Sequence, residues 1–183
     1  AEPAQQLTAD DPAVRRMAAL EMADTDTSAI PRLKDALEDP DPLVRRAAAR
    51  ALSSFGTPAL PALSAALKSE DAVLKRNVLM FLSEMGPEAT GAIRPALADE
   101  DEMVRARAIL ALSTIKPMSQ KVLDLLVSAS DDESSIVSSA AVEAVMSHMT
   151  VVYEEPLPTE GWKFRTDPQQ IGREQEWYAV NLD

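Results

Sequence analysis

Between residues 42 and 52, apolar and polar positions follow each other with the spacing of a helix. The apolar positions form one stripe, made of Val44, Ala47, Ala48, Ala51 and Leu52. Residues three or four positions apart share one face of a helix, so the stripe predicts an amphipathic helix. Asp41 can cap the free N–H groups of the first turn, and Pro42 stands where a missing N–H costs nothing. The sequence therefore predicts a helix that begins at a defined residue.

The same pattern recurs at a period of 30 residues. Its other copies begin at Asp11, Asp71 and Asp101, and each has an apolar residue after three positions and a basic residue after four. A fixed period of this size is typical of an array of repeats, because one repeat cannot bury its apolar face alone. A fifth unit, with a longer turn, runs through residues 122–145.

A shorter apolar pattern precedes each of these helices and predicts another helix in every repeat. Apolar residues occupy one register of this pattern in three copies, at Leu33, Leu63 and Ile93. Pro31 and Pro61 share one register and must either lie in the first turn or leave a kink, whereas Pro95 lies deeper and is expected to bend its helix. Each repeat is thus a pair, called the first helix and the second helix below.

Helix pairs with the pattern D-x-x-V-R-x-x-A-x-x-A-L in the second helix resemble HEAT repeats, most closely the short HEAT-like repeat of the bilin-lyase type. The resemblance covers about residues 10–149. It implies an all-α fold, a right-handed solenoid of helix pairs with the second helices on the concave side. We therefore expect residues 1–150 to form one HEAT-like solenoid.

Residues 151–183 differ in kind, because they lack the helical period and hold both tryptophans and both tyrosines of the chain. We expect an extended aromatic tail. It resembles the opening of the sugar-binding jelly-roll domain that precedes the catalytic part of family 2 glycoside hydrolases. The matching positions are Trp162, Phe164, Thr166, Asp167, Pro168, Gly172, Trp177 and Tyr178. Three interpretations follow: the tail docks on the last repeat, binds sugars by stacking, or forms the first strand of a following β domain.

Composition narrows the range of partners. The net charge is −12, which argues against nucleic acid and anionic membranes, because phosphate binding needs a basic field. A protein partner with a basic patch is expected instead, and carbohydrate only through the tail or a domain beyond it. No apolar run approaches the 18 residues of a membrane span. The chain begins with Ala1-Glu2-Pro3 rather than methionine, which slightly favours an exported or periplasmic protein over a cytoplasmic one.

The basic residues of the second helices are the sharpest chemical feature. One column at period 30, called the basic ladder below, consists of Arg15, Arg45, Lys75 and Arg105. Each lies four residues after an aspartate, a spacing that places acid and base on neighbouring turns of a helix. The ladder either grips an acidic partner or pairs with aspartates of its own or an adjacent repeat. Four other bases lack such a fixed acid: Arg46, Arg50, Arg76 and Arg107. They are the predicted partner contacts, together with Trp162, Trp177 and Tyr178.

Catalytic chemistry finds little support in the sequence. Cysteine is absent and His148 is the single histidine, so no catalytic, cofactor or metal site is predicted. The acidic runs at residues 99–102 and 131–133 are expected to be solvated helix caps rather than calcium ligands. Core filling is the expected role of Met80, Phe81, Met85, Met103, Met146 and Met149.

These observations favour a non-catalytic scaffold that binds a protein partner on its concave face. One alternative is the N-terminal accessory module of an exported carbohydrate-active enzyme. Another, which follows from the resemblance alone, is a subunit similar to a bilin lyase.

Overall fold

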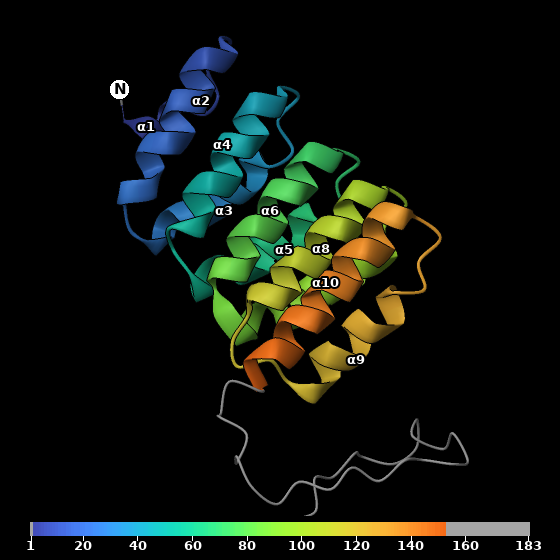
Figure 1. Ribbon diagram of the computed structural model, residues 1–183. Coiled ribbons are helices and arrows are strands. Elements are labelled where there is room, and N and C mark those ends of the chain that lie inside the picture. Colours follow the sequence, from blue (N-terminus) through green and yellow to red (C-terminus); the bar gives the residue numbers. More distant parts are fainter. Residues whose placement is uncertain (1, 153–183) are drawn as a thin grey trace, which may run out of the picture. The chain divides into compact units, whose positions relative to one another are not determined.

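The computed structural model describes residues 2–152, with side chains to His148, and this part of the chain is all-α (Figure 1). The α-helices are α1 (Pro3–Gln6), α2 (Pro12–Glu21), α3 (Ile30–Ala36), α4 (Pro42–Ser53), α5 (Leu60–Ala66), α6 (Ala72–Glu84), α7 (Thr90–Ile93), α8 (Glu102–Thr114), α9 (Gln120–Ala129) and α10 (Ser135–Val152). Short 3₁₀ helices are η1 (Met22–Asp24), η2 (Thr27–Ala29), η3 (Thr57–Ala59), η4 (Gly86–Ala89) and η5 (Arg94–Ala98). The predicted all-α fold of helix pairs is confirmed.

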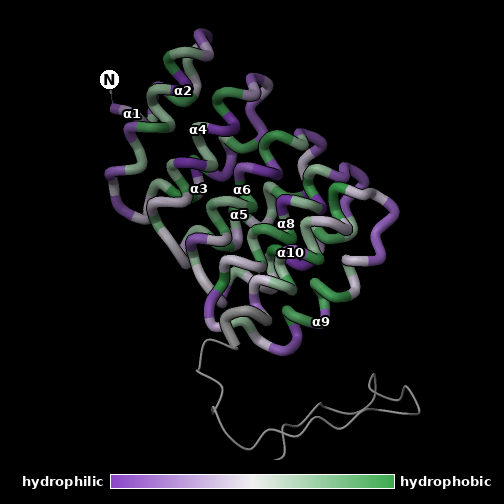
Figure 2. The backbone as a smooth tube through the Cα atoms, in the orientation of Figure 1, coloured by the Kyte–Doolittle hydropathy of each residue, from purple (hydrophilic) through white to green (hydrophobic). Residues whose placement is uncertain are grey.

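The helices of residues 2–147 form two layers. The second helices α2, α4, α6 and α8 pack side by side in chain order, and the first helices α3, α5 and α7 pack in order behind them (Figure 1). Within a repeat, α3 packs on α4, α5 on α6 and α7 on α8. Hydrophilic residues gather in the loops that join the helices (Figure 2). Each repeat therefore covers the apolar face of the next, as a stacked array requires.

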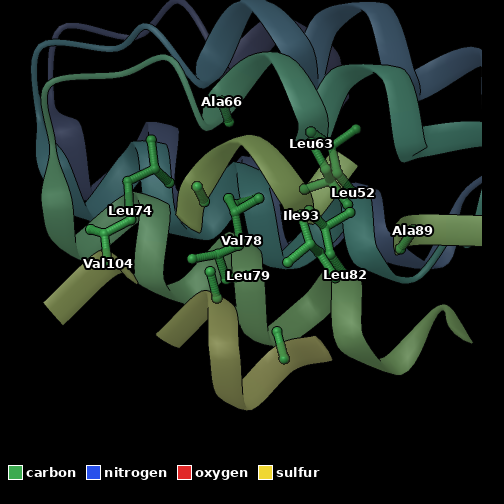
Figure 3. Packing of buried hydrophobic residues seen from close by; sticks show 14 of the residues in the cluster. Leu52, Leu63, Ala66, Leu74, Val78, Leu79, Leu82, Ala89, Ile93 and Val104 are labelled. Carbon is green, nitrogen blue, oxygen red and sulfur yellow. The ribbon is translucent and has the colours of Figure 1, made fainter. Parts of the chain in front are cut away.

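The core lies between the two layers. Leu63 and Ile93 of the first helices point towards Leu52 and Leu82 of the second helices (Figure 3), and all four are fully buried. The register predicted from the sequence holds, since Leu33 is buried in the same way. Burial of apolar surface stabilises the fold by roughly 25 cal/mol per Å².

Small residues let the second helices approach one another closely. Ala18, Ala48 and Ala108 occupy one register in three repeats and are fully buried. A methyl group fills the space between neighbouring helices without holding them apart. This use of alanine explains how a chain that is 46% hydrophobic but only 4% aromatic builds a continuous core.

Glycine and proline set the helix boundaries. Gly56 and Gly86 have φ angles of 60° and 78°, a region in which only glycine is free of strain. Pro31 and Pro61 stand in the first turns of α3 and α5, the first of the two expected arrangements. Pro95 does more than bend its helix: α7 ends at Ile93 and the chain continues as η5.

The described repeats belong to one compact unit, Ala1–Ser147, and the rest of the chain is assigned to a second unit. The tail expected at residues 151–183 lies outside the described residues apart from residues 151–152, the end of α10. The boundary between residues 150 and 151 and the extended tail stay predictions.

Candidate functional site

The four bases of the basic ladder each form an ion pair with the following repeat. The paired atoms are 2.7 Å apart in Arg15–Asp39, 2.6 Å in Arg45–Asp71, 2.6 Å in Lys75–Asp99 and 2.9 Å in Arg105–Asp132. Of the two interpretations of the ladder, pairing with the adjacent repeat is therefore correct. The aspartate four residues earlier serves each helix as an N-cap instead, as Asp41 does by accepting from Leu43 N–H at 2.8 Å.

The arginines of the ladder also hold the loop of their own repeat. Arg45 Nη1 donates to the carbonyl oxygens of Asp39 and Pro40 at 2.9 and 3.1 Å. Arg15 and Arg105 make the equivalent pair of bonds. Each donates to the backbone carbonyl oxygens of the residues that lie five and six positions earlier in the chain. One guanidinium group thus joins its own loop to the next loop, because its five N–H donors point in fixed directions. The ladder is a structural clamp between repeats.

Two steps of the clamp are incomplete. Lys75 donates only to the two carboxylate oxygens of Asp99, at 2.8 and 2.6 Å, and makes no bond to a carbonyl group. At the position equivalent to Asp39 and Asp99 the chain has Ser69, so Arg45 pairs with the N-cap Asp71. The Nε atom of Arg45 is consequently buried without a hydrogen-bond partner.

The clamp shifts the titration of its carboxylates. Hydrogen bonds from Arg15 and Arg105 lower the pKa of Asp39 and of Asp132. Burial raises the pKa of Asp71, but bonds from Leu74 N–H and Arg45 outweigh it, so that the net shift is downward. The expectation that residues 99–102 and 131–133 are solvated caps is wrong for Asp99 and Asp132, which are clamp partners, whereas Asp101 caps α8 as expected.

The predicted contact arginines behave differently from the ladder. Within residues 2–148, none of Arg46, Arg50, Arg76 and Arg107 forms an ion pair. Arg50 and Arg107 are exposed, whereas Arg46 and Arg76 are partly buried, and Arg46 Nε is buried without a hydrogen-bond partner. Arg16 shares the register of Arg46 and Arg76 and is exposed and unpaired in the same part of the chain.

Exposed apolar side chains accompany these arginines. Leu43, Val73 and Met103 share one register and are 46%, 36% and 42% exposed. Met80 and Leu110, seven residues after the last two, are 40% and 44% exposed. The expected core role is therefore wrong for Met80, Met103 and Met146, the last of which is 62% exposed. Periodicity missed these residues because each lies beside a true core position.

Arginines and apolar residues share one face of the second-helix layer. In α4 they follow at i, i+3 and i+7, a spacing that holds them on one side of the helix. The second-helix face, as we call it, consists of Arg16, Met17, Leu43, Arg46, Arg50, Val73, Arg76, Met80, Met103, Arg107 and Leu110. Since α2, α4, α6 and α8 lie side by side (Figure 1), the face continues across four repeats.

Acidic residues are confined to the margins of this face. Those of α2, α6 and α8 stand at a helix end, as Glu21, Glu84 and Glu102, and α4 has none. In α10 the position equivalent to Leu110 is Glu143. The second-helix face is therefore basic and apolar over α2–α8 in a chain of net charge −12.

Metal and membrane-spanning sites are two further kinds of site to consider in the described part of the chain. No three His, Asp or Glu side chains gather as metal ligands among the described residues. None of the described helices combines the length and the hydropathy that crossing a membrane requires. The predicted contacts Trp162, Trp177 and Tyr178 lie outside the described residues.

Comparison with known proteins agrees with the repeat architecture. The family model of HEAT repeats matches residues 2–83 and 60–146. No curated protein matches the chain significantly.

Solved structures share the fold at low sequence identity. The complex of CpcE and CpcF of phycocyanin lyase from Nostoc sp. PCC7120 has a TM-score of 0.59 and 22% identity, over 81% of this chain and 64% of that chain. An engineered protein has a TM-score of 0.51 and 22% identity, over 78% of this chain and 77% of that chain. At this identity the likeness concerns the stacked helix pairs and not the chemistry.

Proposed function

The chain belongs to the HEAT-repeat family, and from this we propose that it is a non-catalytic scaffold that holds a protein partner on its second-helix face. The resemblance implies that this is the concave side of the stack. Such arrays offer extended surfaces whose curvature follows from the small rotation between repeats. The fold alone serves many roles, so the proposal depends on what this face carries.

One observation carries the proposal: apolar side chains stand exposed at the same register in consecutive repeats. Leu43, Val73 and Met103 each leave a third or more of their surface in water. Single exposed apolar residues are ordinary, but contiguous apolar patches on a protein surface are typical of interaction sites. Methionine and arginine are also enriched at protein interfaces, and both kinds of residue lie on this face.

The titration of the clamp supports a non-catalytic role. General acids and bases work best when their pKa lies near the operating pH. Here the pKa values of Asp39 and Asp132 move downward, away from neutrality, and that of Arg105 moves upward through its bond to Asp132. The perturbed groups of the clamp therefore serve to join repeats, and Asp26, whose pKa is lowered by hydrogen bonds from Ser28, caps η2.

Site-specific cross-linking tests the proposal. A photoreactive phenylalanine derivative replaces Met103 on the second-helix face or, as a control, Val127 of the first helix α9, which is 51% exposed. After irradiation of cells that produce the protein, we expect a cross-linked protein band from position 103 and a band at least fivefold weaker from position 127. Equal cross-linking from both positions, or none from position 103, would contradict the proposal.

A further inference from the structure

We propose that the partner segment bound by the second-helix face is acidic, with apolar side chains set among its aspartates and glutamates. This inference rests on the proposed function and adds the chemistry of the partner. The net charge of −12 predicted a partner with a basic patch, but the local charge of this face has the opposite sign.

The arginines of the face form a row of like charge. Arg16, Arg46 and Arg76 occupy one register of α2, α4 and α6, which pack side by side. Packed helices lie about 8–10 Å apart, which is about one Debye length at physiological ionic strength. Neighbouring guanidinium groups therefore repel one another unless negative charge is brought to the row.

The chain's own carboxylates near the row are already committed. Asp39, Asp71 and Asp99 each pair with a base of the ladder, and their side chains are 8%, 13% and 12% exposed. The acids of α2, α6 and α8 stand at the helix ends. Within the described chain, the arginines of the face form no ion pair. Asp71 attracts Arg46 as well as its own partner Arg45, and for the rest of the row a ligand can supply the negative charge.

The apolar residues show which kind of anion fits. Val73 and Met80 flank Arg76 on one face of α6, and Met103 and Leu110 flank Arg107 on α8. A nucleic acid would meet these side chains with phosphates and sugars, and the chain as a whole repels it. A polypeptide can place a carboxylate on each arginine and an aliphatic side chain on each apolar residue, so charge and apolar surface are both complementary.

Two matched charge reversals isolate this face. The first variant carries Arg50→Glu, Arg76→Glu and Arg107→Glu on consecutive second helices. The control carries Arg32→Glu, Lys68→Glu and Arg94→Glu, which replace exposed bases of the first-helix layer and its loops and change the net charge equally. Circular dichroism verifies the helix content of both. If the first variant fails to fold, Arg50→Gln, Arg76→Gln and Arg107→Gln takes its place.

The experiment is selection from a random library of displayed 16-residue peptides on the immobilised full chain. We expect the unaltered protein and the control to enrich the same peptides, which carry a net negative charge and several aliphatic or aromatic residues. The variant on the second-helix face should bind these peptides at least tenfold more weakly. Raising the salt concentration from 50 to 500 mM should weaken binding to the unaltered protein at least fivefold.

The possible failures are distinguishable. Neutral or basic enriched peptides, or equal enrichment by the second-helix variant, would overturn the acidic partner and leave the scaffold proposal standing. Binding of a 20-nucleotide single strand as tightly as the best peptide would also overturn it. Failure of the unaltered protein to enrich any peptide would overturn it too. The scaffold proposal itself fails if position 103 gives no cross-link or one no stronger than that from position 127.

Discussion

Position 75 is the step of the ladder at which lysine stands in place of arginine. Lys75 makes the ion pair to Asp99 but not the two bonds to carbonyl groups that Arg45 makes. The guanidinium group introduced by Lys75→Arg would reach the carbonyl oxygens of Ser69 and Glu70, which are the equivalent acceptors. A hydrogen bond contributes about 0.5–1.5 kcal/mol net, so we expect the free energy of unfolding to rise by about 1 kcal/mol.

Denaturant titration measures this change. Lys34→Arg is the matched control, because Lys34 is exposed on α3 and forms no ion pair within the described residues. It should leave the unfolding midpoint unchanged. A midpoint that Lys75→Arg does not raise would show that the carbonyl bonds of the other steps contribute little.

Position 69 is the second incomplete step. Ser69→Asp would offer a carboxylate to the Nε atom of Arg45, which is buried without a partner, in the way that Asp39 accepts from Arg15 Nε at 2.7 Å. We expect about 1 kcal/mol of added stability by denaturant titration. The gain should disappear in the presence of Arg45→Met, since methionine has no N–H group to donate, whereas a lysine could pair with the new carboxylate as Lys75 does with Asp99. An equal gain in that background would rule out this mechanism.

Acid should weaken the clamp. The pKa values of Asp39, Asp71 and Asp132 lie below their usual value of about 4, so the native state binds fewer protons than the unfolded state as pH falls. Their contribution is present above about pH 4 and is lost as pH falls through the lowered native values. Thermal unfolding followed by circular dichroism should show a midpoint that falls steeply below pH 4. Asp39→Asn should lower the midpoint at pH 7 and reduce the decrease of the midpoint below pH 4. If the decrease stays the same in this variant, the account is contradicted.

The sequence offered pairing between repeats as one of two interpretations of the ladder and did not identify the acceptors. Four bases at period 30 indicated pairing, and the nearest repeated acids were the caps such as Asp41. The acceptors Asp39 and Asp99 also share a register, but Ser69 interrupts it. Which acid meets which base depends on the course of the loops, and a helical spacing rule contains no information about them.

At the scale of the element, glycines offer a direct comparison. Gly56 has φ 60° and ψ −139°. In this conformation the backbone of any residue other than glycine is strained. Gly91 lies within α7 without a positive φ, and a Cβ atom added at either residue would meet nothing within 4 Å. Gly56→Ala should therefore destabilise by about 1–3 kcal/mol through the backbone alone.

Gly91→Ala should stabilise by about 0.5–1 kcal/mol, because alanine loses less conformational entropy in a helix. Thermal unfolding of the two variants under identical conditions measures both effects. Equal effects of the same sign would show that backbone conformation does not distinguish the two positions.

The helices were predictable from periodicity, but their exposed faces were not. The stripe at residues 44–52 and its copies identified the second helices and their buried registers. The same rule assigned Met80 and Met103 to the core, because it treats apolar character as evidence of burial. Met103 adjoins the buried Val104, and only the packing of neighbouring helices shows which of the two faces outward.

At the scale of the molecule, the array divides its residues between two tasks. The core and the clamp join neighbouring repeats, and the second-helix face is free of both. Stability in such arrays is approximately a sum of terms within repeats and between neighbours. Substitutions on the second-helix face should therefore weaken binding and leave stability nearly unchanged. Substitutions in the core should lower stability and leave the residues that contact the partner in place.

The most direct test measures both properties in one variant. Val73→Ser combined with Met103→Ser removes exposed apolar groups, and Leu74→Ala removes a fully buried one. We predict that the double variant changes the free energy of unfolding by less than about 1 kcal/mol, while Leu74→Ala costs about 2–5 kcal/mol. The double variant should also bind the protein cross-linked from position 103 at least tenfold more weakly. Unchanged binding, or a loss of stability equal to that of Leu74→Ala, would contradict the assignment of this face to partner binding.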